Sequence, residues 1–393
     1  MTDVIEAILN ATQRCVAVSG FTALTADGIA TRAEISRSTL YRAFPGGRHE
    51  IVEALLRREF DEFFRDLYER VRGVTDVSDL MVTGLMHARR QIMSHPILNV
   101  ALDEDAETLD EVLDDLVGQI TVVIATFIAE QLPDGPCREE RSRYLARIAL
   151  SFMSTPGSWR FDNRRQVEDL VKCEMSPHVT NAVTRRARAR SVVPSAVDST
   201  IYQRVATALM DAYIDGASLS MEAIAQRAHI SRATLYRTFP GGRSSLVATT
   251  IEIERGRVLA RIAQVVTRAE TLDGALVSIL GELGRYGEFS PIMVALRDRQ
   301  PEILRDQLRF AKGQRNFAVI TAHVAPLLTV WVGTEASERL VDWVLRIAVS
   351  YWMDPSPELN FESWGSIERF YGRHLAGGVA ELVALPTNSP DVV

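Results

Sequence analysis

The chain carries one twenty-residue segment twice. The first copy begins at Ile29 and reads IATRAEISRSTLYRAFPGGR, and the second begins at Ile224 and reads IAQRAHISRATLYRTFPGGR, with sixteen of the twenty positions identical. The copies start 195 positions apart, so each half of the chain has to fold a module of the same kind. Each copy holds four arginines, whereas the whole chain has a net charge of −7. Basic faces on an acidic chain are typical of proteins that bind a polyanion, most simply DNA.

Length and composition fit two folded halves. The 393 residues, 47% of them hydrophobic, exceed the usual size of one core and can fill two. No signal-peptide pattern or membrane-length apolar run is present, so we expect a soluble, cytoplasmic bacterial protein, associated with the nucleoid when bound to DNA and without a membrane partner. Three scattered cysteines and seven histidines without metal-ligand spacing predict no metal and no other cofactor.

Helical periodicity predicts an all-α fold in both halves. In the first half an apolar stripe over 5–19 precedes two short helices with Thr25 and Ser36 as N-caps, and Pro45-Gly46-Gly47 then breaks the chain. Longer helices are expected at 48–71, 78–93, 96–102, 108–131, 139–154 and 166–173. The second half repeats this order, because residues 291–293 and 346–355 resemble residues 96–98 and 147–156.

The repeated segments have the pattern of a helix-turn-helix, whose second helix enters the major groove of DNA. In residues 25–44, Ile29, Leu40 and Phe44 have the spacing of inner faces, and the other side chains of the second short helix point outward. The resulting candidates for DNA contact are Thr25, Ser36, Arg37, Ser38, Thr39, Tyr41, Arg42 and Arg48 in the first copy, and Ser220, Ser231, Arg232, Ala233, Thr234, Tyr236, Arg237 and Arg243 in the second.

The candidates divide into two roles. Arg37 and Arg232 begin their helices, where an arginine commonly reaches guanine O6 and N7. The tyrosines and the last arginine of each copy flank the reading helix and are expected to bind phosphates.

The motif S-R-[SA]-T-L-Y-R-x-F-P-G-G-R resembles the recognition-helix signature of the TetR family of bacterial transcriptional regulators, here as a tandem pair. The chain departs from the family pattern in two respects. Glu34 and His229 stand where the turn usually carries a glycine, so this turn must tolerate a side chain. The family usually forms homodimers of chains about half as long, whereas this chain contains both halves.

The resemblance implies two TetR-like helical modules, each with a three-helix DNA-binding domain and a helical ligand-binding and dimerisation domain, paired as an intramolecular pseudo-dimer. We expect helix-turn-helix domains at 1–46 and 200–241, helical domains at 47–176 and 242–385, a basic linker at 177–199 and a tail at 386–393. The arginines of the linker either form a solvated charge run or act as a basic arm that touches DNA.

The resemblance also implies a pocket for a small hydrophobic effector in each helical domain. The apolar candidates are Met81, Met86, Met93, Ile97, Leu98 and Phe127 in the first half, and Ile279, Leu283, Tyr286, Phe289, Met293 and Phe317 in the second. Taken singly, each of these side chains is better explained by core packing, whereas clusters of this kind suit a ligand pocket.

These observations predict a sequence-specific transcriptional regulator, most simply a repressor, that binds an imperfect palindrome in double-stranded operator DNA and is released by its effector. Two other classes stay open. A ligand-binding or protein-interaction module would have helix-turn-helices that no longer read DNA, but both copies keep Ser-Arg-x-Thr-Leu-Tyr-Arg. An enzyme would need a clustered catalytic set, which the sequence lacks, so we expect none. Activation instead of repression, and further association of chains, stay open as well.

Overall fold

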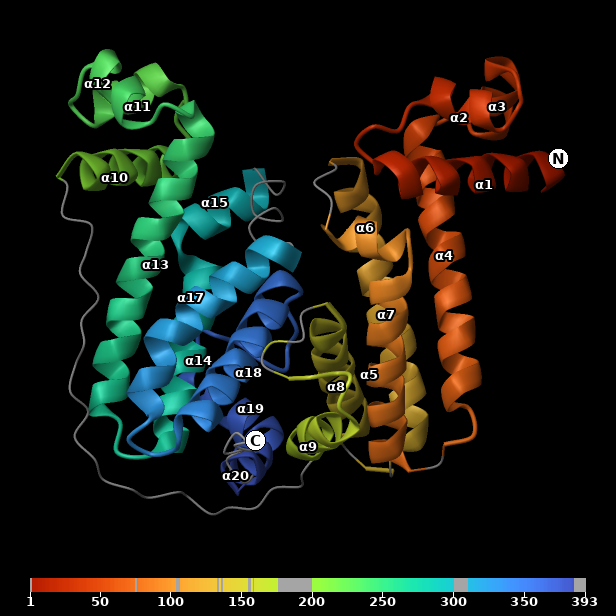
Figure 1. Ribbon diagram of the computed structural model, residues 1–393. Coiled ribbons are helices and arrows are strands. Elements are labelled where there is room, and N and C mark those ends of the chain that lie inside the picture. Colours follow the sequence, from red (N-terminus) through yellow and green to blue (C-terminus); the bar gives the residue numbers. More distant parts are fainter. Residues whose placement is uncertain are drawn as a thin grey trace, which may run out of the picture. The chain divides into compact units, whose positions relative to one another are not determined.

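The computed structural model consists of helices joined by loops (Figure 1). It describes residues 2–74, 76–103, 107–132, 134–135, 137–154, 157, 159–175, 200–299 and 310–384, and every regular element within these ranges is a helix. The predicted all-α class is therefore confirmed. The linker expected at 177–199 and the tail expected at 386–393 lie outside the described residues.

Residue contacts divide the chain into two compact units, Met1–Pro177 with Arg305–Arg315, and His178–Leu304 with Asn316–Val393. The first unit contains α1 (Thr2–Ser19), α2 (Ala26–Arg32), α3 (Arg37–Ala43), α4 (Arg48–Val71), α5 (Val77–Ser94), α6 (Leu98–Asp103), α7 (Glu107–Gln131), α8 (Arg138–Ser154) and α9 (Arg164–Met175). The second contains α10 (Thr200–Ile214), α11 (Met221–Arg227), α12 (Arg232–Thr238), α13 (Gly242–Arg268), α14 (Leu272–Phe289), α15 (Pro291–Arg299), most of α17 (Phe310–Leu328), α18 (Thr334–Met353), α19 (Trp364–His374) and α20 (Ala376–Ala384).

The helices predicted from periodicity are present with small differences at their ends. The long helix expected at 48–71 is α4 with the same bounds, and α5 and α7 extend their predicted ranges by one residue at one or both ends. The duplication is also visible in the bounds, because α5 and α14 have equal lengths and are offset by 195 residues. We call residues with this offset equivalent.

Helices α1, α2 and α3 and the start of α4 enclose a small core, which we call the first reading head. Its fully buried side chains come from all four helices and from the loop after α1, and include Ile8, Phe21, Ile29, Leu40, Ile51 and Leu55. Gly47 has φ 64°, a conformation that glycine adopts without steric cost, and this residue lets α4 start directly after the turn. The second reading head repeats the arrangement with α10, α11, α12 and the start of α13, and buries Ile224, Leu235, Phe239 and Leu246.

Each long helix, α4 or α13, continues from its reading head into a helical domain (Figure 1). In the first unit α5 packs against α4, α8 and α9, and α7 packs against α4 and α8. In the second unit α14 packs against α13, α15, α18 and α19. With 24 residues, α4 is about 36 Å long, so one rigid element spans both domains of its unit.

Glycines on α14 give the second helical domain a packing of its own. A Cβ at Gly284 would overlap the ring of Phe361, and a Cβ at Gly287 would overlap the ring of Trp352. In the first unit the residue equivalent to Gly284 is Arg89, which donates a hydrogen bond to the Met153 carbonyl at 2.7 Å. The two helical domains therefore share a plan but differ in their interior contacts.

Candidate DNA-binding site and apolar cavity

Hydroxyl caps fix the start of each recognition helix, α3 and α12. Ser36 Oγ accepts a hydrogen bond from the Thr39 N–H at 3.1 Å, and Ser231 Oγ accepts one from the Thr234 N–H at 3.1 Å. Thr25 caps α2 in the same way, accepting from the Gly28 N–H. Such caps satisfy backbone donors that the first helical turn leaves unpaired. The predicted caps at Thr25 and Ser36 are confirmed.

The turn before each recognition helix contains a side chain in a left-handed conformation. Glu34 has φ 56° and His229 has φ 53°, and they are the non-glycine residues with positive φ among those that the structure describes. The Ile35 N–H donates to the Ala30 carbonyl at 3.0 Å across this turn. That bond, with its neighbour from the Glu34 N–H to the Thr31 carbonyl, forms a Schellman end of α2. The turn thus tolerates a side chain as expected, at a steric cost that glycine would not have.

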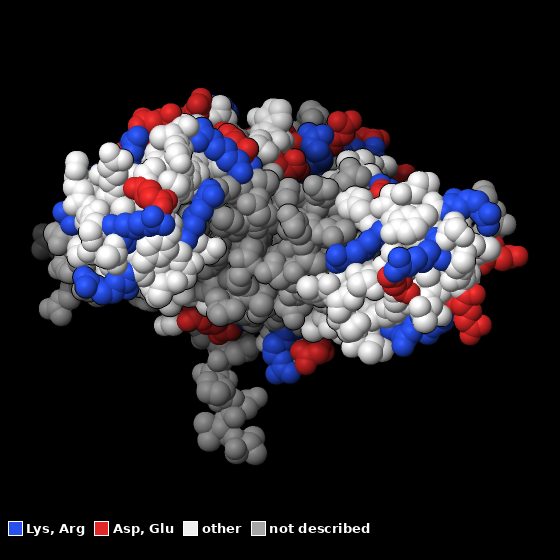
Figure 2. Space-filling view, turned by 90° about the horizontal axis from the view of Figure 1, so that it is seen from above, with Lys and Arg blue, Asp and Glu red and all other residues white. Residues whose placement is uncertain are grey.

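The side chains expected to contact DNA lie at the surface of both reading heads. All sixteen are exposed except Thr39, Thr234 and Arg48, which are half-buried. Tyr41 and Tyr236 keep 48% and 42% of their surfaces exposed, which is unusual for large aromatic side chains. The surface of each head shows basic groups separated by uncharged ones, with few acidic groups between them (Figure 2).

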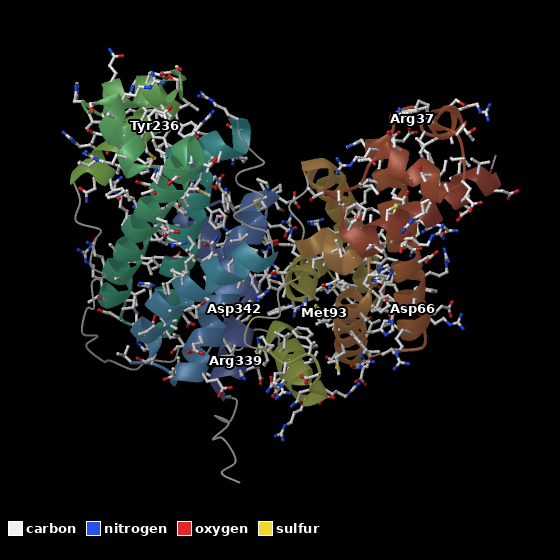
Figure 3. All side chains as sticks on the ribbon, turned by 45° about the horizontal axis from the view of Figure 1, so that its top comes forward. Arg37, Asp66, Met93, Tyr236, Arg339 and Asp342 are labelled. Carbon is white, nitrogen blue, oxygen red and sulfur yellow. The ribbon has the colours of Figure 1, made fainter. Side chains whose placement is uncertain are left out.

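In both heads an acidic residue of the preceding helix pairs with the first arginine of the recognition helix. Arg37 forms an ion pair with Asp27, and Arg232 forms one with the equivalent Glu222 at 2.6 Å (Arg37 is labelled in Figure 3). All four side chains are more than half exposed, so each pair contributes at most about 1 kcal/mol and can open at low cost. Each acidic side chain therefore keeps its arginine near the start of the recognition helix by a weak contact that can be exchanged for another partner.

The two arginines that follow the PGG turn differ between the heads. Arg48 Nη2 donates to the Phe21 carbonyl at 2.8 Å, and its buried Nε has no partner among the described residues. Arg243 is exposed. The guanidinium of Arg48 is therefore partly used within its own head, whereas Arg243 presents its guanidinium to solvent.

A buried carboxylate connects the first reading head to the helices behind it. Glu59 on α4 is 1% exposed and accepts hydrogen bonds from Gln13 of α1 at 3.2 Å and from Arg58 at 2.7 Å. His95 Nε2, at the junction of α5 and α6, lies 3.3 Å from the same carboxylate. His95 Nδ1 accepts from the Leu98 N–H at 3.2 Å, so the junction itself is tied to Glu59. One carboxylate thus holds three segments together.

The equivalent carboxylate in the second unit, Glu254, has a more open environment. It is 8% exposed and pairs with Arg257, whose side chain is 48% exposed. Tyr286 stands where the first unit has Gln91, and burial, with the negative charge of Glu254, raises the pKa of its hydroxyl above the ordinary value. That hydroxyl has no hydrogen-bond partner within the described part of the chain. The two units therefore connect α4 and α13 to their neighbours by different polar contacts.

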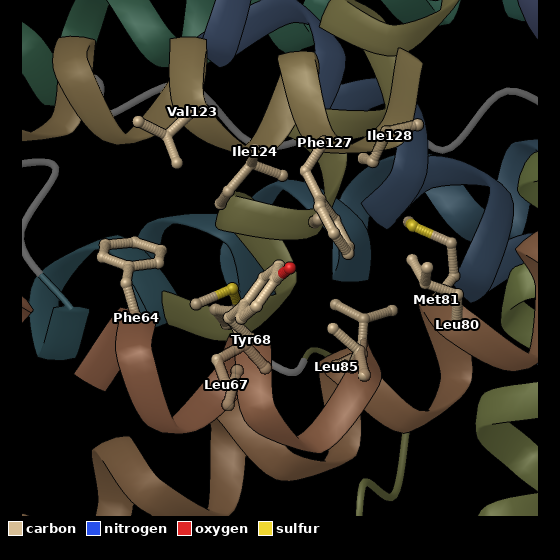
Figure 4. A pocket seen from close by; sticks show the side chains of 15 residues that line it. Phe64, Leu67, Tyr68, Leu80, Met81, Leu85, Val123, Ile124, Phe127 and Ile128 are labelled. Atoms are coloured by element: carbon tan, nitrogen blue, oxygen red, sulfur yellow. The ribbon is translucent and has the colours of Figure 1, made fainter. Parts of the chain in front are cut away.

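An apolar cavity of about 140 Å³ lies in the first helical domain, between α4, α5, α7 and α8 (Figure 4). Its walls are Phe64, Leu67, Tyr68, Val71, Leu80, Met81, Gly84, Leu85, Ala88, Val123, Ile124, Phe127, Ile128, Ala149 and Met153. The one side-chain polar atom in this set is the Tyr68 hydroxyl, and no lining residue is charged. A cavity of this composition favours uncharged, hydrocarbon-like molecules.

Of the six pocket residues proposed for the first half, Met81 and Phe127 line this cavity. The other four lie elsewhere. Met86 is half-buried outside it, and Met93 is 47% exposed at the end of α5 (Figure 3). Ile97 is completely buried in the core of the reading head and Leu98 is 2% exposed, so both side chains fill packing space.

Within the described part of the second unit, no cavity is lined by the six pocket residues proposed for the second half. Ile279, Leu283 and Met293 are buried in the core. Phe289 is 43% exposed, and Phe317 lies with its ring 5.9 Å from the Arg346 guanidinium. An open groove of about 670 Å³ in this unit lies at the other end of α14, beside α19 and α20. None of the six residues borders that groove.

Two groups of residues at these sites were not predicted from the sequence. Asp27 and Glu222 could have been found, because an acidic residue precedes the first recognition-helix arginine by ten positions in both copies. Gly84 could have been noticed as a glycine inside a helical pattern, which often has a packing reason. No comparable signal places Tyr68 at the cavity, because the packing of α7 decides which face of α4 borders the cavity.

The two reading heads, with exposed basic recognition helices behind capped turns, define a DNA-binding protein of the helix-turn-helix class. The family model for bacterial regulatory proteins of the tetR family matches residues 8–55 and 216–248, one segment in each unit. Each unit therefore carries a DNA-binding segment of the TetR family of transcriptional regulators, as the motif indicated.

Relatives and a solved structure match about half of the chain. The uncharacterized HTH-type transcriptional regulator Rv1255c of Mycobacterium tuberculosis is 24% identical over 46% of this chain and 89% of its own length. The HTH-type transcriptional repressor KstR of the same species is 27% identical over 42% of this chain and 74% of its own length. The crystal structure of the TetR family repressor AlkX from Dietzia sp., implicated in biodegradation of n-alkanes, is 21% identical over 44% of this chain and 91% of its own, with a TM-score of 0.34.

Among the described residues, no helix combines the length and apolarity needed to cross a membrane.

Proposed function

We propose that this regulator is a repressor that binds one imperfect palindrome with both of its reading heads, so that a single chain does what a homodimer does in most of its family. The near identity of the two recognition helices carries this proposal. Their outward residues differ in little more than Ser38 against Ala233. Two heads with nearly the same reading face favour two nearly identical half-sites, and half-site symmetry mirrors the symmetry of the protein.

Arginine contacts to bases would supply much of the specificity. A bidentate arginine–guanine pair contributes roughly 1–3 kcal/mol of discrimination. The weak ion pairs of Arg37 and Arg232 with their acids support this role, because they keep the guanidinium groups near the groove-facing end of the helix and give them up at low cost.

Hydroxyl-radical footprinting of Arg37→Ala and Arg232→Ala tests the use of both heads. Each variant should relax base preference in one half-site and leave the other half-site protected. Tyr68→Phe, which removes only a hydroxyl distant in sequence from the reading heads, is a control that should not change the footprint. Protection confined to one half-site in the wild-type protein, or one arginine variant without effect, would contradict the proposal.

The number of chains per operator is a separate test. Pairing of two linked modules benefits from a high effective concentration, so one chain of 43.7 kDa should occupy each palindrome. Sedimentation velocity of the complex with a duplex of known mass measures this directly. A stable complex with two chains on one palindrome would show that the modules pair between chains.

We further propose that an uncharged small molecule in the cavity of the first unit lowers DNA affinity. Support comes from α4, because Ile51 and Leu55 belong to the core of the reading head and Phe64 and Tyr68 line the cavity. A ligand changes DNA affinity only by its differential affinity for the free and bound states, and a tenfold difference corresponds to about 1.4 kcal/mol. Operator release measured by fluorescence anisotropy, on ligands found by thermal shift, tests the link. Ligands that stabilise the protein without changing operator affinity would remove it.

A further inference from the structure

We propose that the chain is an asymmetric sensor: one effector molecule, uncharged and mainly hydrocarbon, binds in the first unit, and the equivalent space in the second unit is filled by the protein's own side chains. The inference rests on the proposed function, since it concerns the same ligand site. It adds the number of ligands for each chain, the unit that binds, and the chemistry of the ligand.

The chemistry of the cavity restricts its ligand. A charged or strongly polar molecule would lose its hydration and find one hydroxyl group, that of Tyr68, in return, which makes its transfer unfavourable. The volume of about 140 Å³ is close to that of an apolar cavity of ~150 Å³ that stays free of water and admits benzene. The cavity therefore fits a compact hydrocarbon, or one with a single hydroxyl or carbonyl group directed at Tyr68.

The cavity opens to solvent between Tyr68 on α4 and Val123 on α7. Tyr68 is 53% exposed and Val123 is 55% exposed although both line the cavity. The rings of Tyr68 and Phe127 meet edge to face, with their centroids 6.0 Å apart.

Two small residues on α5 make room for the cavity. Gly84 and Ala88 are one helical turn apart and both line it. A Cβ added at Gly84 would meet one neighbour, Val71 Cγ1, at an ordinary contact distance of 3.9 Å. A larger side chain at position 84 would therefore extend into the cavity without pushing the backbone of another helix away.

The second unit has large side chains at these two positions, Ile279 and Leu283. Ile279 has no exposed surface, and the same holds for other residues that correspond to cavity walls, namely Ile262, Ala275, Leu276 and Leu280. A side chain without accessible surface borders no space large enough for a water molecule. Side chains of α13 and α14 are therefore fully packed in the second unit at the positions where those of α4 and α5 border a cavity in the first.

The groove of the second unit does not replace the missing site. Arg268, Asp273 and Glu368 line it, and the Tyr371 hydroxyl donates to Asp273 Oδ1 at 2.5 Å within it. Charged side chains border this groove and it is wide open to solvent, so it offers an uncharged hydrocarbon less enclosure than the first cavity gives.

Isothermal titration calorimetry of the full chain with benzene as the probe tests the proposal. We expect one binding site for each chain. Gly84→Ile places the second unit's residue into the first unit and should weaken benzene binding at least tenfold. Gly118→Ile on α7 is a matched control, because a Cβ there meets nothing within 4 Å and the residue is outside the cavity, so its binding should equal that of the wild type. Gly84→Ala, a smaller change, keeps the test informative if Gly84→Ile folds poorly, and should weaken binding less.

Two sites for each chain, unchanged binding in Gly84→Ile, or no binding of benzene to the wild type would each overturn the proposal. The outcome also separates this proposal from the proposed function. One benzene site that Gly84→Ile removes would support the asymmetric sensor even if no bound ligand changes operator affinity, and in that case only ligand-controlled release would fail.

Discussion

Replacement of Glu59 by glutamine should destabilise the first unit far more than the equivalent replacement of Glu254 destabilises the second. Glu59→Gln keeps the shape of the side chain and removes its charge. Its carboxylate is 1% exposed and faces donors from Gln13, Arg58 and His95. The amide nitrogen of glutamine would oppose one of these donors instead of accepting from it.

The magnitude follows from the partners. Loss of one member of a buried ion pair costs about 3–5 kcal/mol when the other charge is left unpaired. Arg58 is 16% exposed and keeps Asn10 at 2.8 Å and Glu6 at 3.5 Å, so it is not left alone, and about 2–3 kcal/mol is expected. Glu254 faces an arginine that is half exposed, and its pair contributes about 0–1 kcal/mol.

Native-state hydrogen exchange with mass spectrometry measures both effects in one experiment, because peptides report each unit separately. Glu59→Gln should lower the protection of α1 and α4 peptides by the stated free energy and leave α10 and α13 unchanged. Glu254→Gln serves as the matched control. Equal losses in the two units, or a loss below about 0.5 kcal/mol in the first, would refute the reasoning that burial and partner number set the cost.

Glu34→Gly and His229→Gly should each stabilise their reading heads by up to about 1 kcal/mol. Glycine removes the steric cost of a positive φ, and the larger conformational entropy that glycine loses on folding offsets only part of this gain. A lower thermal midpoint in either variant would count against this. Arg243→Ala should reduce the salt slope of operator binding by about 1, as expected for one lost phosphate contact, whereas Arg48→Ala should change the slope less and the stability more. Anisotropy across a salt series distinguishes these outcomes, and equal slopes would disprove the difference. Gly284→Ala should destabilise the second unit by roughly 1–3 kcal/mol through overlap with an aromatic ring, and a variant as stable as the wild type in urea would be inconsistent with that packing.

The sequence predicts the helices and the reading heads of this protein well, because local chemistry determines them. Thr25 and Ser36 act as caps within three residues of their partners, and the period of apolar residues in α4 is visible in one segment. Even the unusual turn at Glu34 was expected from the position of the residue in the motif. None of these features depends on how distant helices pack.

The cavity could be predicted only in part, since it depends on contacts between helices far apart in sequence. Met81 and Met93 are twelve residues apart on α5, yet the first lines the cavity and the second is exposed. Hydrophobicity indicates that a side chain is apolar, and it does not indicate which neighbour that side chain meets. Ile279 shows the same limit, because it is equivalent to Gly84, yet it is completely buried in the second unit whereas Gly84 borders the cavity of the first.

Placing the two recognition helices in one polypeptide changes how this regulator can evolve. In a homodimer every substitution in a recognition helix is present twice in the bound particle, so a single codon change alters both halves of the contact surface. Here α3 and α12 are encoded separately, and a change at Arg37 leaves Arg232 as it was. Under the proposed binding of one operator by both heads, new operators can therefore be sampled one half at a time, each step losing the contacts of one arginine and not of two.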